Sequence, residues 1–313
     1  MTRQTLQVSP RGPYMANTDL VLRVQASLTE RDHRLLGWLY DHGVLTTPQI
    51  TDALFGSLDF CQRRLLRLTN LAVITRFRPQ KPEGGSYPYH YVIDQLGAEV
   101  VAAQRRDDPP RRDHARTRRR HLTSKANLTH LLATNQFFTD LACYERTHPG
   151  ARLAAWEPVS RFARNGGFFR HGDDPRLMLL PPVRPDGHGL WIQNDRTVPF
   201  LLEMDLGSER QAILVDKVAN YMNIAAYTHR VWPVLFWLPS AARELHLHQR
   251  LAAEFTSITI PVATATSDHA TATGLSPAQA VWWLHGRQGT RLPLAALPAA
   301  HGHDEPAGTG RGN

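Results

Sequence analysis

The sequence predicts an α+β protein with two domains, a helical one followed by one built on a mixed sheet. Three observations predict this class. Apolar residues recur at helical spacing near the N-terminus, an arginine-rich stretch interrupts this pattern, and strand-like and helix-like segments then alternate. At 313 residues, the chain is long enough for two domains that each bury a core.

The first domain, residues 27–104, is predicted to contain three helices and a hairpin. The first helix closes at a glycine, the short second helix closes at Gly56, and the third helix is basic. Residues 74–94 then alternate around a Gly84-Gly85 turn, which is a hairpin signal. A helix, a short helix, a basic helix and a hairpin, in this order, are typical of a winged helix-turn-helix, whose third helix enters the major groove of DNA.

Polar side chains of the third helix and the hairpin are the candidate DNA contacts. Those expected to face the groove are Gln62, Arg63, Arg64 and Arg67. Those expected to contact the DNA backbone from the wing are Arg76, Arg78 and Lys81. The wing also carries Tyr87, Tyr89 and Tyr91, which either share one face and pack on the helices or contact bases or sugars.

Charge favours a polyanionic partner, since 36 Lys and Arg outnumber 28 Asp and Glu and give a net charge of +8. Residues 105–120 alone hold eight arginines and two prolines without apolar periodicity. We therefore expect residues 105–125 to be a linker, which either engages phosphates or is only a solvated spacer. Residues 1–26 are expected to be a flexible arm and residues 301–313 a disordered tail.

Several other classes of protein and site find no support in the sequence. No apolar run approaches the ~20 residues that span a bilayer, and the N-terminus lacks a secretory signal, so a cytoplasmic location is expected. Cys61 and Cys143 show no paired spacing that would indicate a disulfide framework or a zinc site. The sixteen histidines are not clustered as zinc ligands, and no glycine-rich phosphate loop is present.

The second domain, residues 126–255, has the predicted order α-β-β-β-α-β. This order implies a mixed sheet with a helix against each face. The following residues, 256–300, form a C-terminal extension. Within it, 256–273 read weakly as a strand and loop, and 275–287 as a short terminal helix.

Three carboxylates, Asp186, Glu203 and Asp205, lie in or beside two neighbouring strands of this domain. Glu203 and Asp205 are two residues apart and so point to the same face, and a hairpin would bring Asp186 close. Clustered carboxylates raise each other's pKa unless a cation is present, which favours bound Mg²⁺ or Mn²⁺. Lys217 and Tyr221 share a face of the next helix, where a cation either orients a water or holds the scissile phosphate. Alternatively, Glu203, Asp205 and Lys217 are ordinary surface charges.

The element order, with "PDG" before one strand and "EMD" on the next, resembles the PD-(D/E)xK restriction-endonuclease-like superfamily. The resemblance implies that Asp186 and Glu203 hold a metal ion and that Asp205, Lys217 and Tyr221 belong to the same catalytic site. Asp205 stands where that superfamily carries a lysine. Some branches of the superfamily carry the basic group on the following helix instead. Lys217 and Tyr221 lie where other branches carry a Gln-x-x-x-Tyr pattern, so Lys217 is a candidate for this relocated basic group.

The fuller pattern of a winged helix, an arginine-rich joint, "RPDG", "LLEMDLGSE" and "DKVANY" looks like the replication-relaxation proteins of bacterial plasmids and integrative elements. The resemblance implies binding of double-stranded DNA during replication, relaxation or mobilisation of a mobile element, with replication or mobilisation proteins as partners. Two alternatives stay open. One is a transcriptional regulator whose second domain dimerises, and the other is an accessory protein that recruits a replicase or relaxase.

Overall fold

A computed structural model describes residues 13–122, 125–163, 165–179 and 183–300. Within these ranges, the chain forms two compact units. The first includes the described residues through Ile50 and from Ser57 to Leu122. The second includes Thr51–Gly56 and the described residues from Lys125 onward. The break between Ser124 and Lys125 falls inside the segment that the sequence marks as a linker.

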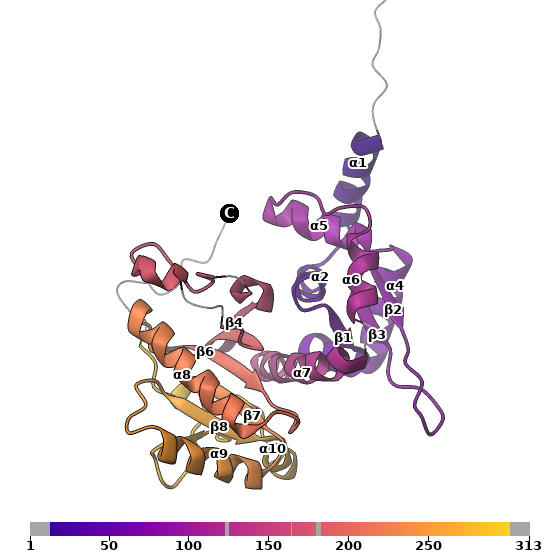
Figure 1. The fold of residues 1–313 in the computed structure, drawn as a ribbon. Helices are drawn as coiled ribbons and strands as arrows, with labels where there is room; N and C mark the ends of the chain where they lie inside the picture. The colour runs from indigo at the N-terminus through magenta and orange to yellow at the C-terminus, as the bar shows by residue number, and fades with distance from the viewer. Residues whose placement is uncertain (1–12, 123–124, 164, 180–182, 301–313) are drawn as a thin grey trace, which may run out of the picture. The chain divides into compact units, whose positions relative to one another are not determined.

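The first unit is built from helices and a small antiparallel sheet in which β3 lies between β1 and β2 (Figure 1). Its elements are α1 (Pro13–Gln25), α2 (Glu30–His42), β1 (Val44–Thr46), α3 (Thr47–Ile50), α4 (Leu58–Asn70), β2 (Ile74–Phe77), β3 (His90–Ile93), α5 (Gln95–Arg105) and α6 (His114–Leu122). The core is formed by the fully buried leucines of α2 and α4 together with β-branched residues of the strands. The predicted order of helices and the hairpin is confirmed.

A buried ion pair ties α2 to α4. Thr29 caps α2 in a capping box with Asp32, whose carboxylate is almost inaccessible to solvent. Arg64 of α4 donates to this carboxylate through Nε at 2.8 Å and through Nη2. Burial raises the pKa of Asp32, but the hydrogen bonds from Arg64 and Thr29 outweigh it and hold that pKa below its usual value. Arg64 is therefore part of the internal structure of this unit.

Two segments of the first unit differ from the expectations. Residues 13–25, expected to belong to a flexible arm, form α1, and residues 1–12 of that arm lie outside the described residues. Residues 114–122 of the expected linker form α6. Arginines anchor this part of the chain beside buried Ala115: Arg118 of α6 donates to the Asp41 carbonyl oxygen at 2.9 Å, and Arg105, the last residue of α5, donates to the Asp41 carboxylate at 2.8 and 2.6 Å. A search for apolar periodicity cannot detect contacts of this kind.

The second unit contains a six-stranded mixed sheet in the order β4-β5-β6-β7-β8-β9. Strands β4, β5 and β6 are antiparallel, β6, β7 and β8 are parallel, and β9 is antiparallel to β8. Its elements are the π-helical turn η1 (Thr51–Phe55), α7 (Lys125–Thr147), β4 (Ala151–Glu157), η2 (Val159–Phe162), η3 (Pro175–Leu179), β5 (Gly187–Gln193), β6 (Arg196–Met204), α8 (Gln211–Thr228), β7 (Val234–Leu238), α9 (Ala241–Glu254), β8 (Val262–Thr266), α10 (Ser267–Thr273), β9 (Trp283–Leu284) and η4 (Leu294–Ala296).

The predicted order from α7 to β7 is confirmed, but the sheet continues further. β8 and β9 extend it within the expected C-terminal extension, and α9 connects β7 to β8. The short helix expected at residues 275–287 is wrong, because Trp283 and Leu284 pair with β8 as strand β9. Long-range strand pairing overrides local helix propensity there.

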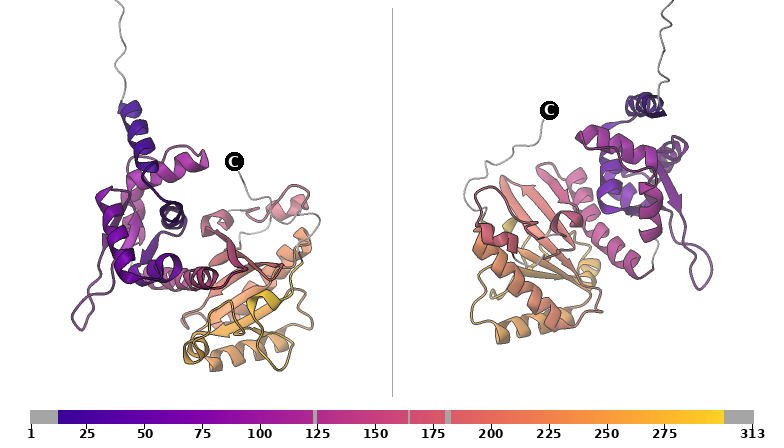
Figure 2. Two further views of the ribbon diagram at one scale, coloured as in Figure 1. Left: turned by 180° about the vertical axis from the view of Figure 1, so that it is seen from behind. Right: turned by 45° about the horizontal axis from the view of Figure 1, so that its top comes forward.

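Helices cover both faces of this sheet. α8 and α9 pack on each other and on one face, and α8 crosses in front of the strands in Figure 1 and lies behind them in the left view of Figure 2. On the other face, Phe137 and Phe138 of α7 contact Phe200 of β6, with ring centroids 6.1 and 5.8 Å apart. Gly187 lets α7 approach closely, since a Cβ atom there would lie 2.4 Å from the ring of Phe138.

Candidate functional site

The β5–β6 hairpin brings Asp186 beside the end of β6. Gly187 pairs with Leu202, so Asp186, one residue before β5, lies next to Glu203 and Met204. Oδ2 of Asp186 accepts a hydrogen bond from the Met204 backbone nitrogen at 2.8 Å. The predicted proximity of Asp186 to the end of the next strand is therefore confirmed.

Glu203 is buried, with 1% of its surface exposed, and α8 supplies its partners. The Tyr221 hydroxyl donates a hydrogen bond to Oε1. Nζ of Lys217 lies 2.9 Å from Oε2 and also 2.9 Å from Oε2 of Glu209. Among the described residues, the Oε2 atom of Glu203 has no hydrogen-bond partner of regular geometry, so charge rather than hydrogen bonding dominates its contact with Lys217. Lys217 and Tyr221 reach the same carboxylate because they are one helical turn apart.

The environment opposes ionisation of Glu203 more strongly than Lys217 favours it. Burial and the charge of Asp186 raise the pKa of Glu203 to about 7, although Lys217 and Tyr221 lower it. Burial lowers the pKa of Lys217, but the carboxylates of Glu203 and Glu209 outweigh burial and leave it raised. Burial and the nearby charge of Glu203 raise the pKa of Tyr221 well above its usual value. Lys217 is thus a permanent cation here, whereas Glu203 changes its charge near neutral pH.

His130 of α7 completes this group and was missed in the sequence. Its Nε2 atom lies 2.9 Å from the Met204 carbonyl oxygen and 3.4 Å from Oδ2 of Asp186. The hydrogen bond with Asp186 raises the pKa of His130, although burial lowers it. In the sequence, His130 stands among the leucines of an amphipathic helix, and nothing in that pattern separates it from an ordinary surface histidine.

Asp205 has a different partner. It is 3% exposed and forms an ion pair with Arg243 of α9, and its Oδ1 atom accepts a hydrogen bond from the Gly207 nitrogen at 2.8 Å. Nη2 of Arg243 also donates to the Glu209 carbonyl oxygen at 2.5 Å. Arg243 was not a candidate because it lies 38 residues further along the chain. Asp205 is therefore held apart from the pair formed by Asp186 and Glu203.

The arrangement gives a divalent cation no ready ligand set. Each predicted carboxylate ligand already faces a cationic or protonatable side chain: Glu203 faces Lys217, Asp205 faces Arg243 and Asp186 faces His130. Among the described residues, no group of three or more His, Cys, Asp or Glu side chains is arranged to hold a metal ion. In this arrangement these partners already engage the three carboxylates, and a bound Mg²⁺ or Mn²⁺ at this site stays a prediction.

The candidate DNA-contacting residues of α4 divide into two groups. Gln62, Arg63 and Arg67 are exposed, whereas Arg64 is turned inward to Asp32. Arg63 pairs with Asp59 at 2.7 Å, and both side chains are more than two thirds exposed. An exposed pair of this kind contributes only ~0–1 kcal/mol, so it leaves Arg63 available to another partner.

The hairpin presents its cations on tyrosine rings. The guanidinium carbons of Arg76 and Arg78 lie 4.1 and 5.0 Å from the ring centre of Tyr89, and Nζ of Lys81 lies 5.5 Å from that of Tyr87. All three cations are exposed. Beyond β2 and β3, the hairpin is closed by a bridge between residues 80 and 86 and turns at the predicted Gly84-Gly85, both with positive φ. Tyr91, in contrast, is buried in the sheet.

The sequence matches the family described as replication-relaxation over residues 36–235, which is more than half of the chain. The chain belongs to the replication-relaxation family. No curated protein and no solved structure shows a significant match to it.

Membership of the replication-relaxation family indicates a role in the replication or relaxation of a plasmid or other mobile element. The matched range begins within α2 and ends within β7. It therefore contains both the basic hairpin and the group around Glu203, whereas Arg243 lies beyond it. In the described part of the chain, no helix combines the length and the apolar character that crossing a membrane requires.

Proposed function

We propose that the first unit is a winged helix-turn-helix that binds duplex DNA, and that this replication-relaxation protein acts on a plasmid or mobile element through that binding. The element order of the unit and the family membership support the proposal. The observation that carries it is the hairpin on which Arg76, Arg78 and Lys81 stand over tyrosine rings.

The three cations of the hairpin are arranged for an external anion. Among the described residues, none of the three forms an ion pair with a carboxylate. Stacking on Tyr89 and Tyr87 restricts their side chains, which lowers the entropy that is lost when a phosphate is bound. Cations that are exposed, unneutralised and held in place are what a DNA backbone contact requires.

On α4, we propose Gln62, Arg63 and Arg67 as the side chains that enter the groove. Glutamine pairs well with adenine and arginine with guanine in the major groove, so this face is suited to reading sequence. Arg64 has no part in it, because its guanidinium neutralises buried Asp32. Asp59 restricts Arg63 only weakly, since the pair is exposed to solvent.

Fluorescence anisotropy with a labelled plasmid-derived duplex tests the proposal. The variant Arg76→Ala/Arg78→Ala should bind at least ten times more weakly than the wild type. The matched control is Arg152→Ala/Arg287→Ala, which removes the same charge from exposed positions of the second unit. An equal loss of DNA affinity in the two variants would show that only net charge matters and would contradict the proposed binding surface. Binding of a protein partner, but not of DNA, would favour the accessory-protein alternative.

Cleavage of DNA by the second unit is a second candidate, and one observation favours it. Asp186 and Glu203 lie together with Lys217 at the end of β6, so two acidic groups and a cation share one place. The test is incubation of supercoiled, linear and branched DNA with Mg²⁺ or Mn²⁺, using the wild type, Asp186→Ala and Glu203→Ala. Cleavage that both substitutions abolish without loss of DNA binding would establish it. Intact DNA in every sample would leave binding as the function.

A further inference from the structure

A cavity of about 210 Å³ lies in the second unit where three parallel strands end. Its lining follows the carboxyl ends of β6, β7 and β8 and is completed by one face of α7. We call it the strand-end cavity. Ligands of open α/β sheets bind outside the carboxyl ends of parallel strands, because the loops that follow the strands diverge there.

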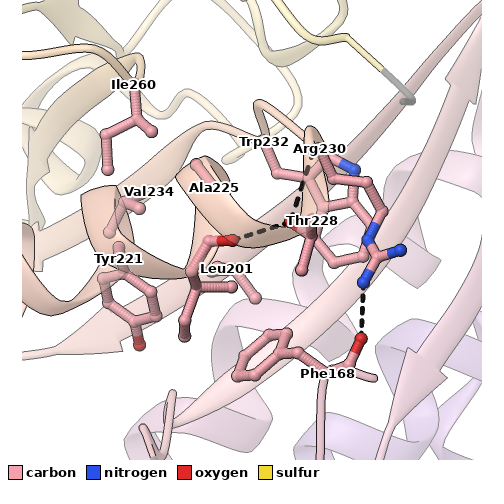
Figure 3. A pocket seen from close by; sticks show the side chains of 10 residues that line it. Phe168, Leu201, Tyr221, Ala225, Thr228, Arg230, Trp232, Val234 and Ile260 are labelled. Carbon is pink, nitrogen blue, oxygen red and sulfur yellow. Dashed lines mark hydrogen bonds between the residues drawn. The ribbon is translucent and has the colours of Figure 1, made fainter. Parts of the chain in front are cut away.

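The size of the strand-end cavity distinguishes it from a packing defect. A water molecule takes up ~30 Å³ of the liquid, so the cavity has room for several waters or for one small organic group. The pocket in Figure 3, between Tyr221, Thr228 and Arg230, is a useful contrast. It offers only about 10 Å³, and the guanidinium of Arg230 is already occupied by Asp173 and by the Phe168 carbonyl oxygen. That pocket holds one water at most.

The walls of the strand-end cavity are partly aromatic. Phe137 of α7 and Trp237 of β7 contact each other edge to face, with ring centroids 5.4 Å apart. Met204 and Leu206 add apolar surface. Such walls suit an alkyl chain, and the faces of aromatic rings attract cations.

Within the part of the chain that the structure describes, one carboxylate of the strand-end cavity has no cationic partner. Asp205 is neutralised by Arg243, but Oδ1 of Asp140 accepts only the amide of Gln136, at 2.6 Å, and within the described residues Asp140 forms no ion pair. Burial and the nearby charge of Asp52 raise the pKa of Asp140 to about 6. At neutral pH, the cavity therefore carries a negative charge that the described chain does not balance.

We propose that the strand-end cavity binds a guanidinium group on an alkyl chain, with the chain against Phe137 and Trp237 and the guanidinium beside Asp140. A guanidinium fits better than an ammonium because its planar fork matches a carboxylate and stacks on aromatic rings. The group has two sources with the same chemistry: a free alkylguanidine, or an arginine side chain of a partner. This inference concerns a site separate from the DNA-binding surface and does not depend on it.

Butylguanidinium and its neutral isostere butylurea are the first probes, titrated into the full-length protein at pH 7.5. NMR of the Trp237 indole N–H, assigned with Trp237→Phe, follows occupancy. Butylguanidinium should bind at least ten times more tightly than butylurea. Asp140→Asn should lower its affinity at least tenfold, whereas Asp216→Asn, a change at an exposed carboxylate of α8, should leave it unchanged. No shift of the Trp237 signal, equal affinity for the two probes, or unchanged affinity in Asp140→Asn would overturn the proposal.

A further ligand and a further variant complete the test. Acetyl-arginine-amide carries the same group with a blocked backbone. Binding like that of butylguanidinium would assign the site to an arginine side chain, and binding at least tenfold weaker would assign it to a free alkylguanidine. Ala133→Leu fills the cavity from α7 and should abolish binding of butylguanidinium even if Asp140→Asn does not fold. Retained binding in Ala133→Leu would place the ligand elsewhere and contradict the proposal.

Discussion

Partly buried Lys217 and buried Glu203 form an ion pair, with 2.9 Å between Nζ and Oε2, at the end of the third strand of the second unit. The pair joins α8 to β6 and lies beside Asp186, so three ionisable groups that are distant in the sequence lie close together, with Glu203 the most buried of them. Because the site is desolvated, the protonation of Glu203 and the stability of the fold are linked.

Glu203→Gln should flatten the dependence of stability on pH. Burial and Asp186 raise the pKa of Glu203 from 4.5 to about 7 in the folded protein, against the opposing effects of Lys217 and Tyr221. As pH rises, Glu203 loses its proton at a lower pH in the unfolded chain than in the folded protein. The free energy of unfolding therefore falls between about pH 4.5 and 7, by up to ~3 kcal/mol. Urea unfolding at several pH values measures this slope. His130, whose raised pKa acts in the same direction, is unchanged in the variant, so the difference between the two curves isolates Glu203.

Lys217→Met should destabilise the protein more in alkaline than in acidic solution. Removing Lys217 leaves the buried Glu203 carboxylate without its cation, which costs up to ~3–5 kcal/mol. At pH 8.5, Glu203, Glu209 and Asp186 would face one another without their cation. At pH 5, Glu203 would take up a proton and much of the cost would vanish. Thermal unfolding at the two pH values checks this, with the exposed Lys81→Met as control. The same loss at both pH values would show that Glu203 does not titrate as described.

Arg64 and Arg67 are three residues apart on α4 and should have separable roles. Arg64→Ala leaves buried Asp32 without its counter-ion and should lower stability by ~3 kcal/mol. Arg67→Ala, at an exposed position, should change stability by less than ~0.5 kcal/mol but weaken DNA binding. Denaturant unfolding and anisotropy of both variants give the comparison. A stable Arg64→Ala variant with impaired DNA binding would reverse the assignment.

Gly187→Ala should disturb the packing of α7 on the sheet. The added methyl group would lie 2.4 Å from the ring of Phe138, so the ring or the strand must move. Overpacking of this kind costs ~1–3 kcal/mol. Gly150→Ala is a useful comparison, because nothing lies within 4 Å of the added atom, although its positive φ of 85° carries its own strain. If Gly187→Ala proves the milder of the two changes, the close approach of α7 is not a constraint.

The two hairpins could be predicted because short stretches of the sequence mark each of them. Alternation and the Gly84-Gly85 turn placed the hairpin of the first unit, and the two-strand pattern around Asp186 and Glu203 placed the hairpin of the second. The partner of Asp205 was not predicted, because Arg243 comes from α9, a helix that was not among the predicted elements although Ser240 caps it and Glu244 lies in its first turn. Likewise, the sequence places Arg64 among the basic residues of the third helix that are expected to contact DNA. Only its ion pair with buried Asp32 shows its structural role. Counter-ions depend on tertiary packing, which a one-dimensional pattern does not contain.

The salt dependence of duplex DNA binding tests the central claim most directly. Each phosphate contact adds ~0.9 to the slope of log K against log salt concentration. The Arg76→Ala/Arg78→Ala variant should therefore show a slope smaller by about 2 than that of the wild type, while Arg152→Ala/Arg287→Ala keeps the wild-type slope. Identical slopes for the wild type and the hairpin variant would mean that these arginines contact no phosphates and would contradict the account.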